Sequence, residues 1–402
     1  MTGLARAGKT ALLTSIAANL LARRDIDVRE APAGATTTPR FDVRSHLAAL
    51  AADPPHWPAR TDAVSLLALD IDIARKPFPP RRLRLELLDY PGEWLLDLPL
   101  LAQSFAQWSA ATLRRLQSRP EAIDFLAFAH GLPAGAAAES LAAAGAALYR
   151  AVLHRLRDEA GLAMLQPGRF LMPAPGAQPP WMEFFPLLGA SPLANLLAQR
   201  YAAYTKSVRD DLASPAFGRI DRLIVLADLL TALHAGQAAF TDAAQALAAV
   251  AAALRWRRAP AFVPDWLANL LPLGGIARVA FVASKADHVA ERQRGNLAAL
   301  VAALTATGPA FTAAFAIAAV RCTEDFVWTL QGRPVSAVRG RVAGQGLVGS
   351  YPGEIPDKPP ADDFWAHPFL EIPEFEPMRL PREGIPNINL AALLTFLLAD
   401  AL

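Results

Sequence analysis

The amino-acid sequence predicts an α/β fold in which a mostly parallel sheet is interrupted by a helical insertion and followed by a β-rich segment. Three observations support this prediction. A glycine-rich loop runs into an apolar helix at the start of the chain, several short apolar strands end in polar residues, and a long Ala/Leu-rich stretch separates two groups of these strands. The chain has 402 residues, of which 53% are hydrophobic, so it can bury a sizeable core.

The first element is the loop of residues 3–10, which reads G-L-A-R-A-G-K-T and matches the phosphate-binding pattern G-x-x-x-x-G-K-[ST]. Its glycines let backbone N–H groups converge on phosphate, next to the positive end of the helix predicted over 11–21. Lys9 is expected to bind the β- and γ-phosphates, and the Thr10 hydroxyl to ligate Mg²⁺. The residues predicted to bind a nucleoside triphosphate here are Gly3, Ala7, Gly8, Lys9, Thr10 and Ala11.

The next elements are two strands, predicted over 64–73 and 83–88 and joined as a hairpin by the proline-rich turn at 76–80. The second strand runs into the pattern D-x-x-G, formed by Asp89 and Gly92. In GTPases the Asp of this pattern approaches Mg²⁺ through water and the Gly N–H meets the γ-phosphate, which makes the segment a switch. Glu93 stands where many GTPases have the Gln that orients the attacking water. Its carboxylate could orient the water or repel the γ-phosphate, and both alternatives remain open.

A threonine that senses Mg²⁺ and the γ-phosphate is expected just before the first of these two strands. Thr61 is the best-placed candidate, because the alternatives at 36–38 lie far upstream of the strand. Arg60 or Arg40 is a candidate for a built-in arginine finger, which contributes about 10³ or more in rate when correctly placed. The alternative is that either arginine only solvates the surface.

The motif that would read the base is S-K-x-D at residues 284–287, after a strand predicted over 277–282. Asp287 is expected to accept hydrogen bonds from guanine, while the Lys285 stem packs along the base and Ser284 replaces the usual Asn or Thr. A further strand, predicted over 315–320, ends at Val320 and Arg321, where a backbone N–H is expected to contact guanine O6. The order of these four motifs predicts a Ras-like GTPase sheet that binds GTP or GDP with Mg²⁺.

Composition excludes several other classes. The formal net charge is +2 and no basic stripe interleaved with aromatics is present, so a nucleic-acid partner is not expected. Asp, Arg or Pro interrupts every long apolar run, so no transmembrane segment is expected. The single cysteine, Cys322, excludes an internal disulfide, fits a reducing compartment such as the cytoplasm, and is expected to be a packing residue.

Several strings of the sequence resemble the YcjX family of bacterial stress-associated P-loop GTPases. The longest reads D-Y-P-G-E-W-L-L-D-L-P-L-L, and it and the others lie at 2–4, 53–58, 89–101, 166–170, 285–289 and 351–354. The resemblance implies a Ras-like G domain interrupted by a mostly helical insertion. It also implies a link to membrane stress, an inner-membrane partner protein, and a cytoplasmic location that can be peripheral to the inner membrane.

The domain organisation follows from the order of the motifs. The G domain is predicted over 1–115 and 218–325, with a buried strand at 221–228 returning to the sheet. The helical insertion is predicted over 116–217, and a small β-rich appendage with a closing helix at 388–402 is predicted within 326–402.

The start of the chain departs from the usual P-loop arrangement. A P-loop follows a buried central strand, but only Met1 and Thr2 precede this one, and family members read V-T-G-L where this chain reads M-T-G-L. We therefore expect that the first strand before the P-loop is missing and that an upstream segment supplies it. Without that strand, each unsatisfied buried backbone group costs about 1–3 kcal/mol.

Three functions are compatible with the sequence. The first is a GTP-hydrolysing switch. The second is a nucleotide-binding or partner-binding module with negligible hydrolysis, suggested by Glu93 and by the expected missing strand. The third is an ATPase, which depends on whether Asp287 reads guanine.

Overall fold

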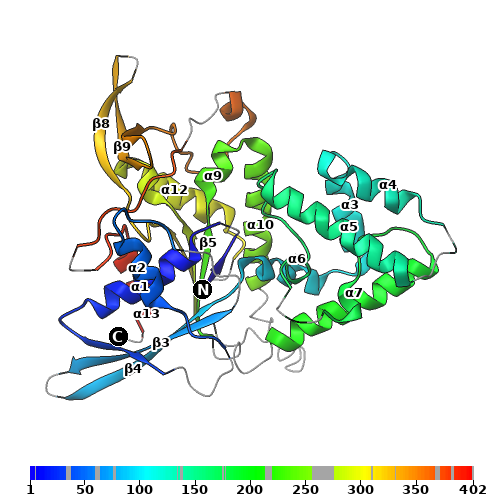
Figure 1. Cartoon of the computed structure of the whole chain (residues 1–402), viewed down its shortest axis with the longest axis horizontal. Helices are drawn as coiled ribbons and strands as arrows, with labels where there is room; N and C mark the ends of the chain where they lie inside the picture. Colours follow the sequence, from blue (N-terminus) through cyan, green and yellow to red (C-terminus); the bar gives the residue numbers. More distant parts are fainter. Residues whose placement is uncertain are drawn as a thin grey trace.

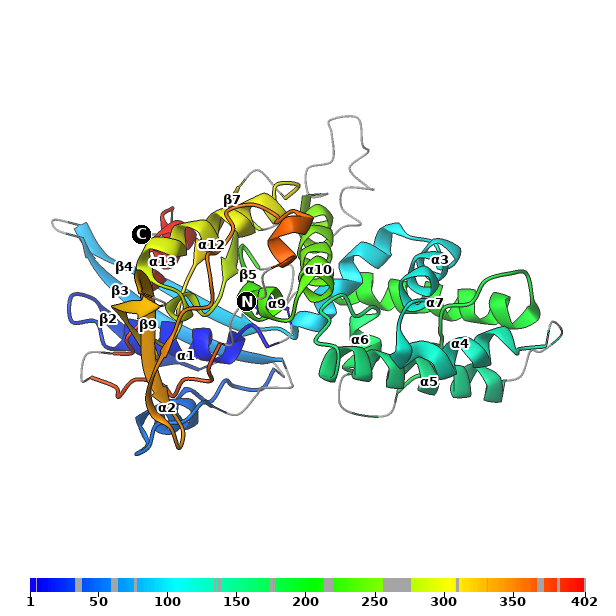
Figure 2. The ribbon, with the colours of Figure 1, turned by 90° about the horizontal axis from the view of Figure 1, so that it is seen from above.

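The structure is a computed structural model, and it describes residues 1–4, 6–32, 38–58, 64–75, 78–133, 135, 139–173, 176, 178–212, 220–255, 276–308, 311–330, 332–366, 372–381 and 384–400. Strands and their flanking helices form one part of the molecule, and a group of helices lies beside it (Figure 1 and Figure 2). The chain is therefore mixed α/β with a parallel sheet, as predicted.

The central sheet is parallel and has the strand order β1-β5-β6-β7. β5 and β6 are almost continuously apolar and buried, as expected for strands covered on both faces. One face packs against α1 and α13, and the other against α10 and α12. The bounds of these elements are β1 (Thr2–Gly3), β5 (Arg222–Ala227), β6 (Arg278–Ala283), β7 (Thr312–Ala316), α1 (Lys9–Leu21), α10 (Gln237–Arg255), α12 (Glu291–Leu304) and α13 (Leu390–Leu398).

A second, antiparallel sheet consists of β2 (Asp27–Ala31), β3 (Ser65–Arg75) and β4 (Phe78–Asp89). Its last strand continues the central sheet, because Met1 N donates to Leu88 O at 2.6 Å and Tyr90 N donates to Met1 O at 3.0 Å. This is the pattern of a parallel pair, so the two sheets follow each other as β2-β3-β4-β1-β5-β6-β7. The predicted hairpin is present, but its second strand begins at Phe78, inside the segment predicted as a turn.

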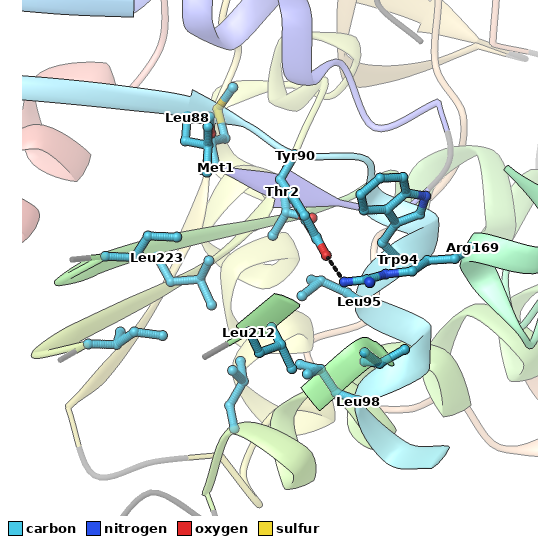
Figure 3. A pocket seen from close by; sticks show the side chains of 14 residues that line it. Met1, Thr2, Leu88, Tyr90, Trp94, Leu95, Leu98, Arg169, Leu212 and Leu223 are labelled. Atoms are coloured by element: carbon cyan, nitrogen blue, oxygen red, sulfur yellow. Dashed lines mark hydrogen bonds between the residues drawn. The ribbon is translucent and has the colours of Figure 1, made fainter. Parts of the chain in front are cut away.

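A small apolar cavity of about 40 Å³ lies where β1 is short (Figure 3). Leu88 of β4 and Leu223 of β5 line it from the sheet side, and Leu95 and Leu212 from the helical side. β1 pairs with β5 only through Thr2 and Gly3, so residues 222–224 pair with β6 but not with β1. The strand before the P-loop, expected to be missing, is present as the two residues of β1.

The helices beside the sheet surround an aromatic core. Trp108, Tyr149 and Phe184 are completely or almost completely buried and pack edge to face. α5 is a long helix of 20 residues, and α3 begins with a capping box formed by Ser104 and Gln107. The elements of this part are η1 (Gly92–Ala102), α3 (Phe105–Leu116), η2 (Pro120–Ala122), α4 (Ile123–His130), α5 (Glu139–Asp158), α6 (Gly168–Leu171), η3 (Pro180–Met182) and α7 (Pro192–Leu212).

The C-terminal part contains a third sheet, antiparallel and ordered β10-β9-β8. The strand predicted over 315–320 is displaced, since β7 covers Thr312–Ala316. Among the described residues, no helix combines the length and the apolar character needed to cross a bilayer. The remaining elements are α2 (Val43–Ala51), α9 (Leu229–His234), η4 (Ala286–His288), β8 (Thr323–Leu330), β9 (Arg333–Val342), β10 (Gly346–Ser350) and η5 (Asp362–Ala366).

Candidate functional site

The phosphate-binding loop and the D-x-x-G segment meet at two glycines. A Cβ on Gly92 would lie 1.3 Å from Gly3 O and 3.2 Å from Lys9 Nζ, so the two backbones touch beside the lysine ammonium. A Cβ on Gly3 would in turn lie 2.5 Å from Leu226 O of β5. Only glycine fits at either position, and the structure thus brings three predicted phosphate-binding residues to one point.

The loop then turns into the first turn of α1. Gly8 has φ of 80°, which glycine adopts without strain, and it forms the N-cap of the helix. Lys9 and Thr10 are the first two residues of α1, where the backbone N–H groups point towards the loop. Ala7 is buried and Ala11 is half-buried. The backbone is therefore arranged as an anion-binding site.

Asp89 lies at the end of β4 and is only 4% exposed. Burial raises the pKa of its carboxyl group above the usual value, and the Lys9 ammonium opposes this shift. The predicted Mg²⁺-binding Asp therefore lies in the field of the predicted phosphate-binding Lys. Glu93 follows Gly92 and is half-buried.

The sequence analysis also named a switch threonine and two candidate arginine fingers for the γ-phosphate. Thr61 and Arg60 lie outside the described residues, as do Thr36 and Thr37. The exposed Arg40 side chain forms an ion pair with Glu30. An arginine finger at Arg40 would have to leave this partner.

The predicted base-reading motif lies at the carboxyl ends of β5 and β6. Ser284 N donates to Ala227 O at 3.0 Å, which ties the motif to β5. Lys285 has φ of 60°, and its Nζ lies 2.5 Å from Asp228 Oδ2, so the lysine is held in place by the neighbouring strand end. Because β1, β5 and β6 run parallel, their carboxyl ends share one edge of the sheet, and both halves of the predicted site lie along it.

Asp287 is 2% exposed and accepts two hydrogen bonds from Cys322. The Cys322 N–H and Sγ both lie 2.8 Å from Asp287 Oδ2. Burial raises the pKa of the Cys322 thiol well above its usual range, so the thiol keeps its proton and acts as a donor. Burial lowers the pKa of His288, the next residue along the chain, because it disfavours the charged imidazolium.

The last predicted loop is close to Asp287, but one of its N–H groups has a partner. Arg321 N donates to Pro386 O at 2.7 Å, so this group would have to leave Pro386 to contact a base. Val320 is 4% exposed. A contact from either backbone to guanine O6 stays a prediction.

Residues that the sequence analysis did not single out bind the D-x-x-G segment to the helices. The Asp97 carboxylate is fully buried and accepts hydrogen bonds from Gly168 N at 2.7 Å, Arg169 N at 3.1 Å and Tyr204 OH at 2.7 Å. Burial raises the pKa of Asp97 to about 6 in spite of these donors. A Cβ on Gly168 would lie 1.7 Å from Glu93 O, so this contact also requires glycine.

Arg169 completes this contact from the other side. Its guanidinium donates to Tyr90 OH at 3.0 Å and lies over the Trp94 ring at 4.9 Å from the centroid (Figure 3). It also forms an ion pair with Asp211 of α7. The segment that follows Asp89 is thus fixed to α6 and α7 by one arginine and one aspartate.

Two of the strings quoted from the sequence, at 89–101 and 166–170, are therefore in direct contact. Both strings belong to the family resemblance, which marked them as important. Nothing in the sequence indicated that they contact each other. The Lys285–Asp228 pair gave no such signal, because 57 positions separate its members.

Comparison with known proteins identifies close relatives of the whole chain. Residues 1–402 match the model of a family described as "YcjX-like family, DUF463". The chain is 32% identical to "Ras-like GTPase YcjX" of Escherichia coli (strain K12), covering 100% of this chain and 95% of the relative. It is 29% identical to the "Ras-like GTPase YcjX" of Shewanella oneidensis, covering 100% of this chain and 94% of that relative.

Proposed function

The chain belongs to the YcjX-like family, and on that premise we propose that it binds guanine nucleotides and hydrolyses GTP. The observation that carries the proposal is the approach of Gly92 to Gly3 beside Lys9 Nζ. A D-x-x-G glycine and a P-loop lysine can act on the same γ-phosphate only when they lie together. The buried Asp89 beside them supplies the third member of this group.

In the proposed mechanism, Lys9 binds the β- and γ-phosphates as a compact charge, and the Gly92 N–H donates to the γ-phosphate. Both groups stabilise negative charge that spreads over the phosphoryl oxygens as the bond to the leaving group breaks. Glu93, the next residue, is close enough in sequence to orient the attacking water. Whether its carboxylate does so determines the rate of hydrolysis.

The residues present also fit a Mg²⁺ ion. Thr10 and Thr61 offer hydroxyl oxygens and Asp89 a carboxylate, and hard oxygen donors are the ligands that Mg²⁺ prefers. Asp89 is 4% exposed, and a buried carboxylate of this kind needs positive charge nearby. When bound, Mg²⁺ neutralises phosphate charge, and Thr10, Thr61 and, through water, Asp89 would hold it.

Base recognition is assigned to the motif at 284–287. Asp287 accepts hydrogen bonds from guanine N1–H and the exocyclic amine, a pattern that adenine does not offer. Lys285, anchored by Asp228, lies along the base. A backbone N–H at Val320 or Arg321 contacts guanine O6.

Single-turnover release of phosphate from GTP tests the proposed hydrolysis. We expect measurable release by the wild-type protein and a loss of about 10²–10³-fold in Lys9→Ala. Lys206→Ala is the matched control, because Lys206 is an exposed lysine on α7 that pairs only with Asp210 among the described residues, so its rate should equal the wild-type rate. Release no faster than in buffer contradicts hydrolysis and leaves the nucleotide-binding or partner-binding module. Equal rates with ATP and GTP support an ATPase.

The family resemblance extends the proposal to organisation and cellular role. We propose that residues 1–115 and 218–325 form the nucleotide-binding unit, that 116–217 is inserted into it, and that 326–402 is an appendage. We also propose a role in the bacterial stress response with an inner-membrane partner protein, from a cytoplasmic location. Co-sedimentation with inner-membrane vesicles tests the membrane partner, and recovery only in the supernatant with both GTP and GDP would contradict that partner.

A further inference from the structure

Three side chains with metal-binding atoms form a compact buried cluster at the base-reading motif. They are Asp287, His288 and Cys322, and their candidate ligand atoms all lie within 4.8 Å of one another. We propose that this cluster binds a borderline-soft divalent cation, with Zn²⁺ the best match, and that Zn²⁺ and a guanine base compete for it. The competition rests on the proposed function, whereas the binding of Zn²⁺ does not.

Two distances within the cluster can be compared with those of a tetrahedral zinc site. Zinc bonds of about 2.0–2.3 Å place neighbouring ligand atoms about 3.5 Å apart. Cys322 Sγ lies 3.6 Å from His288 Nε2, which already fits. Cys322 Sγ lies 2.8 Å from Asp287 Oδ2, so that pair would have to open by about 0.7 Å. A side-chain rotation of this size leaves the backbone in place.

The chemistry of the three groups also suits Zn²⁺. The thiol proton of Cys322 forms the short hydrogen bond to the Asp287 carboxylate, and the cation would take the place of this proton. The thiol proton leaves to water as the Zn–S, Zn–O and Zn–N bonds form, with no change in oxidation state. The resulting thiolate and carboxylate together balance the charge of the dication, which removes the cost of burying an unpaired ion.

His288 gives a second, independent indication of a ligand. The residue is 8% exposed, and its Nδ1 has no hydrogen-bond partner among the described residues. Its Nε2 lies 3.6 Å from Cys322 Sγ, within the range of a weak hydrogen bond to sulfur. Because no partner fixes the proton at Nδ1, the imidazole can carry its proton there and present the Nε2 lone pair to a cation.

The backbone around the cluster is firmly held. Thr323 Oγ1 donates to Asp287 O, and His288 N donates to Lys285 O at 2.9 Å. Arg321, directly before Cys322, is hydrogen-bonded to Pro386 and Met378. Such support fixes the three ligands in advance, so little ordering is needed when the metal binds.

Competition follows from the position of Asp287. The carboxylate that would accept two hydrogen bonds from guanine is the same group that would bind Zn²⁺. It cannot do both at once, so each ligand should weaken the other by the same factor. Mg²⁺ should not compete here, because it prefers oxygen ligands and avoids thiolate.

Equilibrium dialysis with Zn²⁺ in excess Mg²⁺ tests the metal site. We expect one Zn²⁺ per chain in the wild-type protein and an affinity at least about 100-fold lower in Cys322→Ser and in His288→Gln. His234→Gln is the matched control, because His234 is an exposed histidine on α9, and it should bind Zn²⁺ like the wild type. Co²⁺ provides a second readout, since a thiolate-to-cobalt charge-transfer band should appear in the wild type and vanish in Cys322→Ser.

Absence of Zn²⁺ from the wild-type protein, or an affinity for Zn²⁺ in either variant equal to that of the wild type, would overturn the metal site. Repeating the dialysis with saturating GDP tests competition, and the affinity for Zn²⁺ should fall at least about tenfold. Unchanged affinity with GDP bound would overturn the competition. Zn²⁺ bound by a chain that does not bind GDP at all would instead contradict the proposed function and leave the metal site standing.

Discussion

The backbone of Gly92 lies so close to that of Gly3 that not even a methyl group fits between them. At the residue scale, this contact is what places the D-x-x-G segment at the phosphate-binding loop. The neighbouring groups, Lys9 and Asp89, depend on it for their relative positions. A side chain added at Gly92 should therefore disturb the site more than a change to most of the side chains around it.

Replacing Gly92 with Ala should lower both stability and nucleotide binding. The new Cβ would meet a backbone oxygen, so the loop must shift, and we expect a loss of about 1–3 kcal/mol in the free energy of unfolding. Denaturant unfolding measures this change. Gly295→Ala on α12 is the control, because its Cβ meets no atom within 4 Å and alanine favours a helix, so that variant should be as stable as the wild type or slightly more stable.

Asp97 should make the stability of the protein depend on pH. Burial raises its pKa to about 6, above the value of 3.8 of an exposed aspartate, so the native state holds the proton more tightly than the unfolded state. Between about pH 4 and pH 6 this group therefore lowers the free energy of unfolding as pH rises, by about 3 kcal/mol in total. The contribution is fully present at the acid end of the window and lost above pH 6.

The Asp97→Asn variant isolates this contribution, because an amide does not titrate. Urea unfolding at several pH values from 4 to 7 should give a smaller decrease in stability with rising pH than the wild type shows. Parallel curves for the two proteins would show that Asp97 does not titrate in this window.

At the scale of elements, the segment that follows Asp89 is bound to the helices rather than to the sheet. Asp97 accepts hydrogen bonds from the start of α6, and Arg169 joins Tyr90 to α7 through Asp211. A change at the γ-phosphate that moves Gly92 would therefore be transmitted to the helices. Under the proposed function, these contacts would connect the helices to a bound nucleotide.

Arg169→Ala should loosen this segment without unfolding the sheet. The variant loses the hydrogen bond to Tyr90, the contact with Trp94 and the ion pair with Asp211. We expect amide hydrogens of residues 90–102 to exchange about tenfold faster or more, measured by mass spectrometry. Arg82→Ala is the control, since Arg82 is an 84% exposed arginine on β4, and unchanged exchange in Arg169→Ala would contradict the proposed connection.

The elements show how far the sequence alone can predict this fold. The apolar runs that became β5 and β6 were predictable, because both faces of these strands are buried. β7 begins three residues and ends four residues before the predicted strand, because its small alanines carry little pattern. β4 starts within the proline-rich stretch, where its register against β3 shifts between Ile73 and Arg75, an irregularity of the kind at which a strand tolerates proline.

The sequence likewise predicts only part of the candidate site. Lys9, Asp89, Gly92 and Asp287 follow from short motifs, because each motif needs only local chain geometry. Asp228, Arg169 and the contact of Cys322 with Asp287 depend on which strands and helices become neighbours. No local pattern encodes that information, so only the structure supplies it.

At the scale of the whole molecule, two sheets meet at β1, beside the loop that we propose binds the nucleotide phosphates. Met1 joins β1 to β4, and Thr2 and Gly3 join it to β5. The position of the loop that follows β1 therefore depends on the association of the two sheets. A ligand that binds this loop should stabilise the whole sheet, by about 2.7 kcal/mol at a concentration 100 times its Kd.

The most direct test of the account is a nucleotide-binding titration with GTP, GDP and ATP. The wild-type protein should bind GTP and GDP and bind ATP far more weakly, and Lys9→Ala should lose affinity for all guanine nucleotides. Asp287→Asn should prefer xanthosine triphosphate to GTP, because an amide pairs with the carbonyl that xanthine carries in place of the guanine amine. Equal affinity for ATP and GTP, or an Asp287→Asn variant that still prefers GTP, would contradict the account.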